Sequence, residues 1–277
     1  MDFMLIEKIK EVLKENQGTH DLFKRTIVKE FLQMITLSYI YNSSKYKDLI
    51  FYGGSALRHC YGLNRLSEDL DFVNAQKSVD FEEIASDLTG FFRKKHFLKI
   101  DAKVQKFRLL LKFPILKELG LSEFPKTETI YLKIEIFEKF GFCKKYNIEK
   151  VPIFKFGEAV IVNTFDLRTL MATKIKAVLN RKWEKTSKTG EKLAVVKGRD
   201  YYDLMWYFQK GVKPNLNCIE SVKSMKELKN KLKSAVLKID SPSVRYDLDA
   251  LISDKNFIEN VSADIKKILL RFIDKLE

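Results

Sequence analysis

The sequence is poor in the residues that cross-link a chain or hold a structural metal. Its 277 residues include three cysteines and three histidines. Cys60, Cys143 and Cys218 lie far apart, without CxxC spacing or clustered histidines, so a zinc site is not expected. An odd cysteine count also argues against a disulfide scaffold. We therefore expect three small apolar side chains in or near the core.

Long apolar runs are also missing. No stretch approaches the roughly 20 apolar residues that a membrane-spanning helix needs, and there is no internal repeat or long low-complexity tract. The N-terminal MDFMLIEKIKEVLKEN interleaves apolar and charged residues at helical spacing, which is unlike a signal peptide. We therefore expect a cytoplasmic protein with no membrane partner.

Acidic residues are too few to balance the basic ones. The chain has 51 Lys and Arg against 37 Asp and Glu, a formal net charge of +14. Such an excess favours a polyanionic partner, a nucleic acid or a nucleotide, through counterion release and electrostatic steering. The alternative is a chain from a lysine-rich proteome, whose basic proteins need no nucleic-acid role. Charge bears on association and not on fold, so both interpretations stay open.

The pattern of apolar residues divides the chain into three parts. A helical arm over 1–45, packed on the core, precedes an α/β core over 46–163, and a helical part over 164–277 follows. Pro152 is expected in a loop, and the strongly alternating segment 129–138 at or near the centre of a sheet. Helices are expected over 2–16, 21–41, 55–61, 80–97, 166–181, 200–210, 217–238 and 256–276, and strands over 48–52, 70–73, 99–113, 129–138 and 159–162.

A glycine doublet and a serine stand between an expected strand and an expected helix, in the segment FYGGSALRHCYGLNRLSEDLDF. Gly53 and Gly54 let the backbone approach a ligand closely, and Ser55 is expected as the N-cap of the helix. A helix N-terminus offers free N–H groups and a partial positive charge, and the Ser55 hydroxyl can bond a phosphate oxygen. The turn thus predicts a phosphate-binding site.

Two carboxylates follow on one side of the next expected strand. Asp69 and Asp71 flank Leu70, so both carboxylates face the same way while Leu70 faces the core. Paired carboxylates repel each other unless a cation neutralises them, and such pairs suit Mg²⁺, which binds one or two carboxylates together with substrate phosphates. We expect the turn to hold the triphosphate of an NTP and the aspartates to hold the metal that bridges it.

The order and spacing of these motifs resemble a known family. The residues GS, thirteen further residues and then DLD (69–71) are similar to the signature of the polymerase-beta-like nucleotidyltransferase fold. More narrowly, GGSALR followed by NRLSEDLDF resembles the bacterial AbiEii/AbiGii nucleotidyltransferase toxins, and Arg65 and Ser67 match that family's pattern. The resemblance implies an α+β fold, with a small mixed sheet and helices in the core and a helical C-terminal domain. It also implies that Arg65 and Ser67 help to bind the nucleotide.

The resemblance implies roles further along the chain. Glu135 is expected on a neighbouring strand, as a third metal ligand or as a base, although a glutamate beside a lysine is also typical of any half-exposed strand. Lys174 matches a functional lysine of the family and would neutralise charge on the triphosphate or on the leaving pyrophosphate. Asp200, in GRDYYDL, matches an active-site aspartate, although it also suits the capping of a helix start. Asp203 is expected to support this site or to pair with Arg199.

The basic stretch RKWEKTSKTGEKLAVVKGR (181–199) is longer than the corresponding connection in the family that the sequence resembles. It contains Trp183, and a basic loop with an aromatic residue can stack a base. Two interpretations stay open: a loop over the active site that contacts nucleotide or RNA, and a solvated hairpin.

Three functions remain compatible with the sequence. The first is a type IV toxin that uses Mg²⁺ or Mn²⁺ to transfer NMP from an NTP to the 3′ end of tRNA, with a DNA-binding antitoxin as its partner. The second is the same transfer to a small molecule such as an aminoglycoside, or to a protein hydroxyl; a broad basic groove beside Asp69 would count against it. The third is a non-enzymatic nucleotide- or RNA-binding protein, which the intact Asp69 and Asp71 disfavour.

Overall fold

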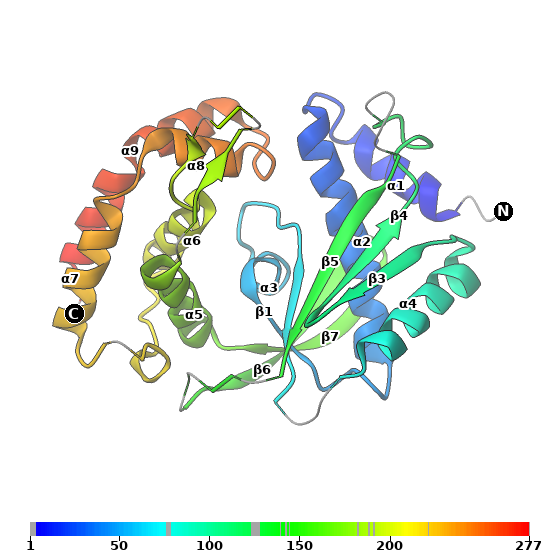
Figure 1. Ribbon diagram of the computed structural model, residues 1–277, viewed down its shortest axis with the longest axis horizontal. Helices are drawn as coiled ribbons and strands as arrows, with labels where there is room; N and C mark the ends of the chain where they lie inside the picture. Colours follow the sequence, from blue (N-terminus) through cyan, green and yellow to red (C-terminus); the bar gives the residue numbers. More distant parts are fainter. Residues whose placement is uncertain are drawn as a thin grey trace. The chain divides into compact units, whose positions relative to one another are not determined.

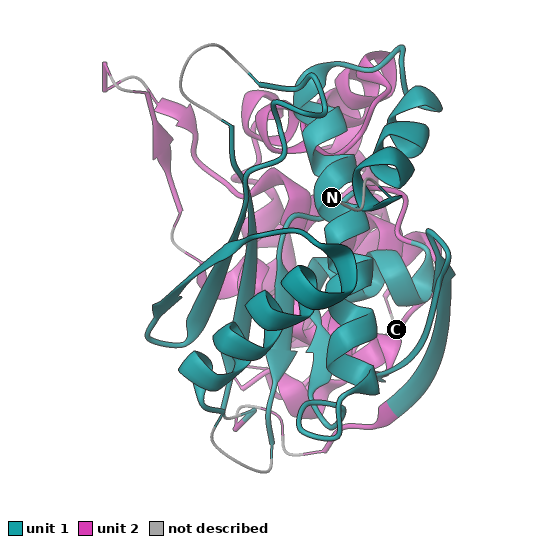
Figure 2. Cartoon of the chain, turned by 90° about the vertical axis from the view of Figure 1, so that its right-hand side faces the viewer, with its two compact units in different colours: residues 1–62, 66–140, 149–164 teal, residues 63–65, 141–148, 165–277 magenta. Residues whose placement is uncertain are grey.

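The computed structural model describes residues 4–75, 79–122, 128–138, 140–141, 143, 145–181, 183–187, 189–190, 192–220 and 222–276. By their contacts these residues fall into two compact units, which Figure 2 colours separately. Unit 1 contains residues 1–62, 66–140 and 149–164, and unit 2 contains residues 63–65, 141–148 and 165–277. Within the described part of the chain, no helix is both long enough and apolar enough to cross a membrane.

Unit 1 is built on a mixed β-sheet. Its strands are β1 (Ile50–Tyr52), β2 (Leu70–Val73), β3 (Asp101–Gln105), β4 (Arg108–Phe113), β5 (Ile130–Phe137), β6 (Ile148–Lys155) and β7 (Glu158–Phe165). In the described residues the strand order is β3-β4-β5-β2-β1-β7-β6 (Figure 1). β1 runs parallel to β7 and β2 parallel to β5, whereas the β1–β2, β3–β4 and β4–β5 pairs are antiparallel. β2 and β5 are therefore interior strands, as expected for 129–138.

Alternating side chains give the interior strands one buried face. In β5 every second residue is an apolar side chain in the core: Ile130, Leu132, Ile134 and Ile136. Successive side chains of a strand point to opposite faces, so Lys133 and Glu135 share the other face of β5. In β2 the fully buried Leu70 lies opposite Ile134. The polar face of these two strands is therefore set by the pattern of apolar residues.

Helices pack around this sheet: α1 (Met4–Lys14), α2 (Asp21–Asn42), α3 (Gly53–Tyr61) and α4 (Phe81–His96). α2 contacts β5, α3 contacts β1 and β2, and α4 contacts β3 and β4. α4 begins where the Asp80 carboxylate accepts hydrogen bonds from two backbone N–H groups of its first turn. Acidic residues in that turn and basic ones in the last turn complement the helix dipole. The helices expected over 21–41 and 80–97 are confirmed.

Unit 2 is mainly helical. It contains α5 (Leu167–Asn180), the hairpin strands β8 (Lys185–Thr186) and β9 (Lys192–Ala194), α6 (Gly198–Gln209), the short 3₁₀-helix η1 (Leu216–Cys218), α7 (Met225–Val236), α8 (Ser241–Leu248) and α9 (Lys255–Asp274). α6 contacts α5, α8 and α9, and most of its residues are buried. A Cβ atom on Gly198 would lie 2.5 Å from Cα of Val244, so this glycine lets α6 and α8 pack closely. The α+β class is confirmed.

The start of α3 differs from the expectation. The helix begins at Gly53 with Tyr52 as its N-cap, so Ser55 lies inside the first turn and is not the cap. Gly53 has a φ of +80°, a backbone conformation that glycine adopts without the steric cost of a side chain. The glycine doublet therefore forms part of the first helical turn and does not merely precede it.

Other local expectations are wrong in detail. The segment 99–113 forms two antiparallel strands because the chain turns at Lys106, which has a φ of +45°. Pro152 lies inside β6, which is an edge strand of the described sheet, where proline is tolerated. The expected helix over 217–238 is divided into η1 and α7, and α8 was not expected.

The cysteines also differ from the expectation. Cys143 and Cys218 form a disulfide across 75 residues of sequence, which links the segment 141–148 of unit 2 to η1. Cys60 keeps a free thiol, and burial raises the pKa of that thiol to about 12. An odd cysteine count argues against a disulfide scaffold, but three cysteines still allow one bridge, and the fold of unit 2 brings Cys143 and Cys218 together.

Candidate active site

Acidic side chains lie side by side on β2 and β5 of unit 1. In the parallel register of these strands, Asp71 lies opposite Glu135. Asp69 directly precedes β2, and Nζ of Lys133 contacts both Asp69 and Glu135, so Asp69 lies on the same side of the sheet as Asp71 and Glu135. The side chains of Asp69 and Glu135 are 28% and 13% exposed, so solvent reaches both. We call these three residues the acidic cluster.

A cationic side chain lies within the acidic cluster. Nζ of Lys133 is 3.1 Å from Oδ2 of Asp69 and 3.3 Å from Oε1 of Glu135. Arg108, from β4, contacts the same oxygen of Glu135 at 3.1 Å. Burial is the largest influence on Lys133 and lowers its pKa, but the carboxylates outweigh it and leave that pKa above its ordinary value. The cluster therefore already accommodates a positive charge.

The acidic cluster fits a divalent cation whose coordination is completed by a substrate. Among the described residues, no three His, Cys, Asp or Glu side chains are placed to hold a metal by themselves. Mg²⁺ needs only one or two carboxylates, because phosphates and waters supply its remaining oxygens. Asp69 and Asp71 provide such a pair, and the ammonium of Lys133 stands where positive charge is stabilised.

The glycine turn lies directly against this cluster. A Cβ atom on Gly53 would lie 2.5 Å from Oδ2 of Asp71 and 3.3 Å from its Cβ, so the position admits only glycine without displacing the carboxylate. Gly53 and Gly54 open α3, and the first N–H groups of a helix have no acceptor within the helix. An anion at this helix start would lie beside Asp71, where a metal bridging the anion and the carboxylate can be placed.

The two serines of the motif are buried. Ser55 is fully buried, and its hydroxyl donates a hydrogen bond to the backbone carbonyl of Asp69. Ser67 is 7% exposed, and its carbonyl accepts a hydrogen bond of 2.9 Å from Nε2 of Gln33. The Ser55 hydroxyl therefore ties α3 to the start of β2. Phosphate contacts at the turn would come from backbone N–H groups.

Two further side chains extend this row of the sheet and were not singled out in the sequence. Tyr52 lies opposite Asp71, and Arg108 lies opposite Glu135. Burial, together with the charges of Asp71 and Glu135, raises the pKa of Tyr52 well above its ordinary value, so its hydroxyl stays protonated. What places both residues beside the acidic cluster is the register of their strands, and register cannot be predicted from the sequence before the strand order is known.

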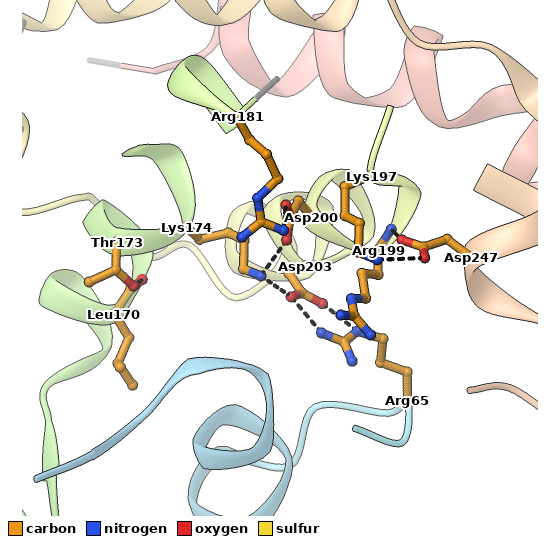
Figure 3. Close-up of polar contacts among 10 residues, drawn as sticks. All are labelled: Arg65, Leu170, Thr173, Lys174, Arg181, Lys197, Arg199, Asp200, Asp203 and Asp247. Atoms are coloured by element: carbon orange, nitrogen blue, oxygen red, sulfur yellow. Dashed lines mark hydrogen bonds and ion pairs between the residues drawn. The ribbon is translucent and has the colours of Figure 1, made fainter. Parts of the chain in front are cut away.

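Unit 2 holds a second ionic group, drawn in Figure 3. Cationic and anionic side chains alternate along it in the order Arg65, Asp203, Lys174, Asp200 and Arg181, and we call these five residues the charge ladder. The Asp203 carboxylate accepts hydrogen bonds of 2.6 and 2.7 Å from Arg65 and lies 2.7 Å from Nζ of Lys174. The same Nζ is 2.8 Å from Asp200, whose other oxygen lies 3.0 Å from Nη1 of Arg181.

Burial makes the charge ladder strongly coupled. The side chains of Arg65 and Asp203 are 2% and 0% exposed, whereas that of Arg181 is 43% exposed. Burial is the largest influence on the pKa of Asp200 and of Asp203 and raises both. The neighbouring cations outweigh it, so both pKa values lie below the ordinary value. Both carboxylates are therefore ionised at neutral pH, and the three cations leave the ladder with a positive net charge.

The expected site residues thus fall into two groups. Asp69, Asp71, Glu135 and the glycine turn come together in unit 1, and Arg65, Lys174 and Asp200 come together in unit 2. Arg65 was expected to contact the nucleotide, but its guanidinium is buried against Asp203. Local sequence could not predict this pairing, because Arg65 and Asp203 are 138 residues apart.

The stretch 181–199 contains a two-stranded hairpin, β8 and β9. Residues 182, 188 and 191 of this stretch lie outside the described residues. Nζ of Lys197 lies 4.5 Å from the ring centroid of Trp183. Both residues of β8 are exposed, whereas Ala194 of β9 is buried and β9 contacts α8, so only the β8 strand of the hairpin fits the expectation of a solvated hairpin.

Comparisons with known proteins give one matching family, and the solved structures that match include two from Helicobacter pylori. The family model described as "Nucleotidyl transferase AbiEii toxin, Type IV TA system" matches residues 36–277. No curated protein matches the chain. The crystal structure of JHP933 from Helicobacter pylori is 18% identical, with a TM-score of 0.46 over 90% of this chain and 94% of that one. A crystal structure described as a "putative nucleotidyltransferase from H. pylori" is also 18% identical, with a TM-score of 0.45 over 91% and 97%.

Proposed function

Because the chain belongs to the AbiEii nucleotidyl transferase toxin family, we propose that it transfers NMP from an NTP to RNA, at the 3′ end of tRNA, in a reaction that requires Mg²⁺. The family match covers residues 36–277 and so includes the acidic cluster and the charge ladder. Membership of the family gives the enzyme class. The metal, the NTP and the RNA acceptor are the proposed part.

The close approach of the glycine turn to Asp71 carries this proposal. Gly53 lies so near the carboxylate that a side chain there would displace it. A phosphate held by the N–H groups of the turn would be next to a carboxylate that can bind the same metal. A glycine turn and an acidic pair are each common separately, and their close contact here supports the proposal of a metal-bound triphosphate.

In the proposed reaction an acceptor hydroxyl attacks the α-phosphorus of the NTP. A new O–P bond forms, the bond to the bridging oxygen of the β-phosphate breaks, and pyrophosphate leaves with the bonding electrons. The hydroxyl proton passes to a carboxylate of the acidic cluster, for which we propose Glu135. Mg²⁺, when bound, neutralises charge on the phosphate oxygens. Asp69 and Asp71 would hold it, and the backbone of Gly53 and Gly54 would orient the phosphates.

The charge ladder is proposed to supply positive charge to the substrate. Lys174 is the member that we propose neutralises the triphosphate or the leaving pyrophosphate. Asp200 and Asp203 are buried, and each holds Nζ of Lys174 within 2.8 Å. We therefore propose that these two aspartates are positioning residues, which act by holding Lys174 in place.

The acceptor and the partner are proposed from charge and from the family. A formal net charge of +14 suits a polyanionic acceptor, because each phosphate contact releases counterions. The family's description as a type IV toxin–antitoxin system implies an antitoxin partner. We propose that this partner is a DNA-binding regulator, and that RNA is the acceptor.

The test compares Asp71→Asn with the matched variant Asp101→Asn, which changes an exposed aspartate at the start of β3. Pyrophosphate release from each NTP is measured in the presence of total RNA over a Mg²⁺ titration. We expect Asp71→Asn to reduce release to background with an unchanged thermal unfolding temperature, and Asp101→Asn to behave as the wild type. Wild-type turnover in Asp71→Asn would refute the assignment of the metal site.

A further inference from the structure

A cavity of about 990 Å³ lies inside unit 2, among the C-terminal end of α5, the segment after it, α6 and α7. Its wall combines aromatic and aliphatic side chains with a cationic rim: Trp183, Tyr201, Val178, Arg181, Lys231 and Lys238. Of these six residues, only Arg181, as a member of the charge ladder, has a role proposed above. Its size lies within the range of ligand-binding cavities in proteins.

The aromatic part of the wall consists of a buried ring, Tyr201 at 5% exposed, and a partly exposed one, Trp183. The Tyr201 hydroxyl donates a hydrogen bond of 3.3 Å to the carbonyl of Ala235, and burial raises the pKa of that hydroxyl to about 12. Its neutral ring is therefore held in place. The indole of Trp183 lies under the ammonium of Lys197, 4.5 Å from the ring centroid. That contact uses one face of the indole, and an aromatic ring has a second face on which a flat ligand can stack.

The rim of the cavity is cationic. Arg181, Lys231 and Lys238 lie on it, and Glu184 is the one carboxylate among the described residues that line the cavity. Glu184 is engaged by Lys192 at 3.4 Å. Lys231 is 39% exposed and 3.1 Å from Glu227. Arg181 follows α5, Lys231 lies within α7 and Lys238 lies just after α7, so the cations are spread along the rim. This spread suits a phosphate chain that passes across the opening, whereas one compact triphosphate would need them gathered at one point.

The cavity is coupled to the charge ladder through α5. Arg181 lies seven residues after Lys174, about 10 Å along the helix axis, and both side chains contact Asp200. A phosphate that binds Arg181 would therefore act on the carboxylate that also holds Lys174. The cavity is thus placed to influence the lysine for which we propose a catalytic role.

We propose that this cavity binds one unpaired nucleotide of the RNA acceptor. The base stacks on Trp183, with the buried ring of Tyr201 behind it in the wall, and the adjoining phosphates lie on Arg181 and Lys238. The inference rests on the proposed function, because it takes RNA as the acceptor. A positive groove with aromatic side chains is the general means by which proteins bind single-stranded nucleic acid without reading its sequence.

The test measures binding of a fluorescein-labelled single-stranded RNA hexamer by fluorescence anisotropy. We expect Trp183→Ala to raise the Kd about tenfold or more, since one base–aromatic stack contributes this much, and Trp183→Phe to retain most of the affinity. Lys238→Ala should raise the Kd several-fold and lower the salt slope by about 0.7, the value for one phosphate contact on a single strand. Lys103→Ala, on the exposed edge of β3, is the matched control for loss of one charge.

Intrinsic tryptophan fluorescence gives a second readout. Its quenching by RNA would not depend on Trp183 if that residue had only a structural role. The chain has two tryptophans, and Trp206 is only 5% exposed. Quenching of fluorescence by the hexamer should therefore come from Trp183 and be absent in Trp183→Phe. Thermal unfolding is measured for each variant as a control for folding. Lys238 is exposed, so Lys238→Ala should unfold at the temperature of the wild type.

The outcomes separate this inference from the proposed function. If the wild type labels RNA while Trp183→Ala and Lys238→Ala keep its KM for RNA and its hexamer affinity, the cavity does not bind the acceptor. If Trp183→Ala raises the KM for NTP alone, the cavity binds the mononucleotide, and the inference is again wrong. If the wild type transfers only to a non-RNA acceptor, the proposed function fails, and this inference fails with it.

Discussion

Replacement of Asp203 by alanine tests the charge ladder most severely. The Asp203 side chain is fully buried and neutralises two cations, Arg65 at 2.6 and 2.7 Å and Lys174 at 2.7 Å. Asp203→Ala would remove the carboxylate that balances the buried guanidinium. Loss of one partner from a buried ion pair costs about 3–5 kcal/mol, because the remaining charge keeps its desolvation penalty. We expect a loss of this size in the free energy of unfolding.

The assay is unfolding by heat and by urea, followed by circular dichroism. A loss of about 3–5 kcal/mol lowers the Tm by roughly 6–20 °C in a chain of this size. Asp264→Ala, at an exposed position of α9, is the matched control and should change stability by less than about 0.5 kcal/mol. The double variant Arg65→Met, Asp203→Leu should cost less than Asp203→Ala, since it removes the buried charge as well as its partner.

Two results would refute this reasoning. Asp203→Ala could unfold within about 0.5 kcal/mol of the wild type, and the buried contacts would then contribute little net stability. The double variant could also be less stable than Asp203→Ala by more than the error of the measurement. In that case packing of the two side chains, and not their charge balance, would determine the stability of this region.

Three further predictions concern pH, the glycine turn and the acidic cluster. Both ladder carboxylates have folded pKa values below the ordinary 3.8, so their contribution to stability is complete above that pH and is lost as the pH falls through the lower folded values. Urea titrations between pH 2.5 and 5 should show that the free energy of unfolding of Asp203→Asn falls less steeply with decreasing pH than that of the wild type. An equal pH dependence in the two proteins would contradict the assignment. Gly53→Ala and Gly62→Ala both place alanine at a positive φ, of +80° and +73°, at a cost of about 1–2 kcal/mol each. Only Gly53→Ala should abolish transfer, because only its Cβ displaces Asp71; equal activity in the two variants would contradict the role of the turn. Lys133→Met removes the ammonium from the acidic cluster, so Mg²⁺ should raise its Tm more than that of the wild type, and equal shifts would contradict the account of the cluster.

Local sequence predicted the strand that contains Asp71 correctly. The expected strand over 70–73 is β2 to the residue. The start of α3 was wrong because a serine is a common N-cap, whereas the positive φ of Gly53 lets the helix begin two residues earlier. The hairpin of β3 and β4 was read as one segment, because apolar alternation continues across the turn at Lys106.

Contacts between distant residues account for what could not be predicted. Glu135 was expected beside the aspartates from the family resemblance, and the parallel register of β2 and β5 places it opposite Asp71. The position of Lys133 between two carboxylates depends on the same register. Arg65 matched a motif, but a motif does not specify whether a guanidinium contacts a substrate or a buried aspartate. Burial decides this, and burial requires the folded chain.

The most direct test of the central claim is a labelling experiment. Purified protein is incubated with Mg²⁺, total bacterial RNA and each α-³²P-labelled NTP in turn, with Asp71→Ala as the control. We predict a labelled band of tRNA size with the wild type, lost without Mg²⁺ and lost in Asp71→Ala. Label that persists in Asp71→Ala, or transfer by the wild type to small molecules or protein with none to RNA, would contradict the account.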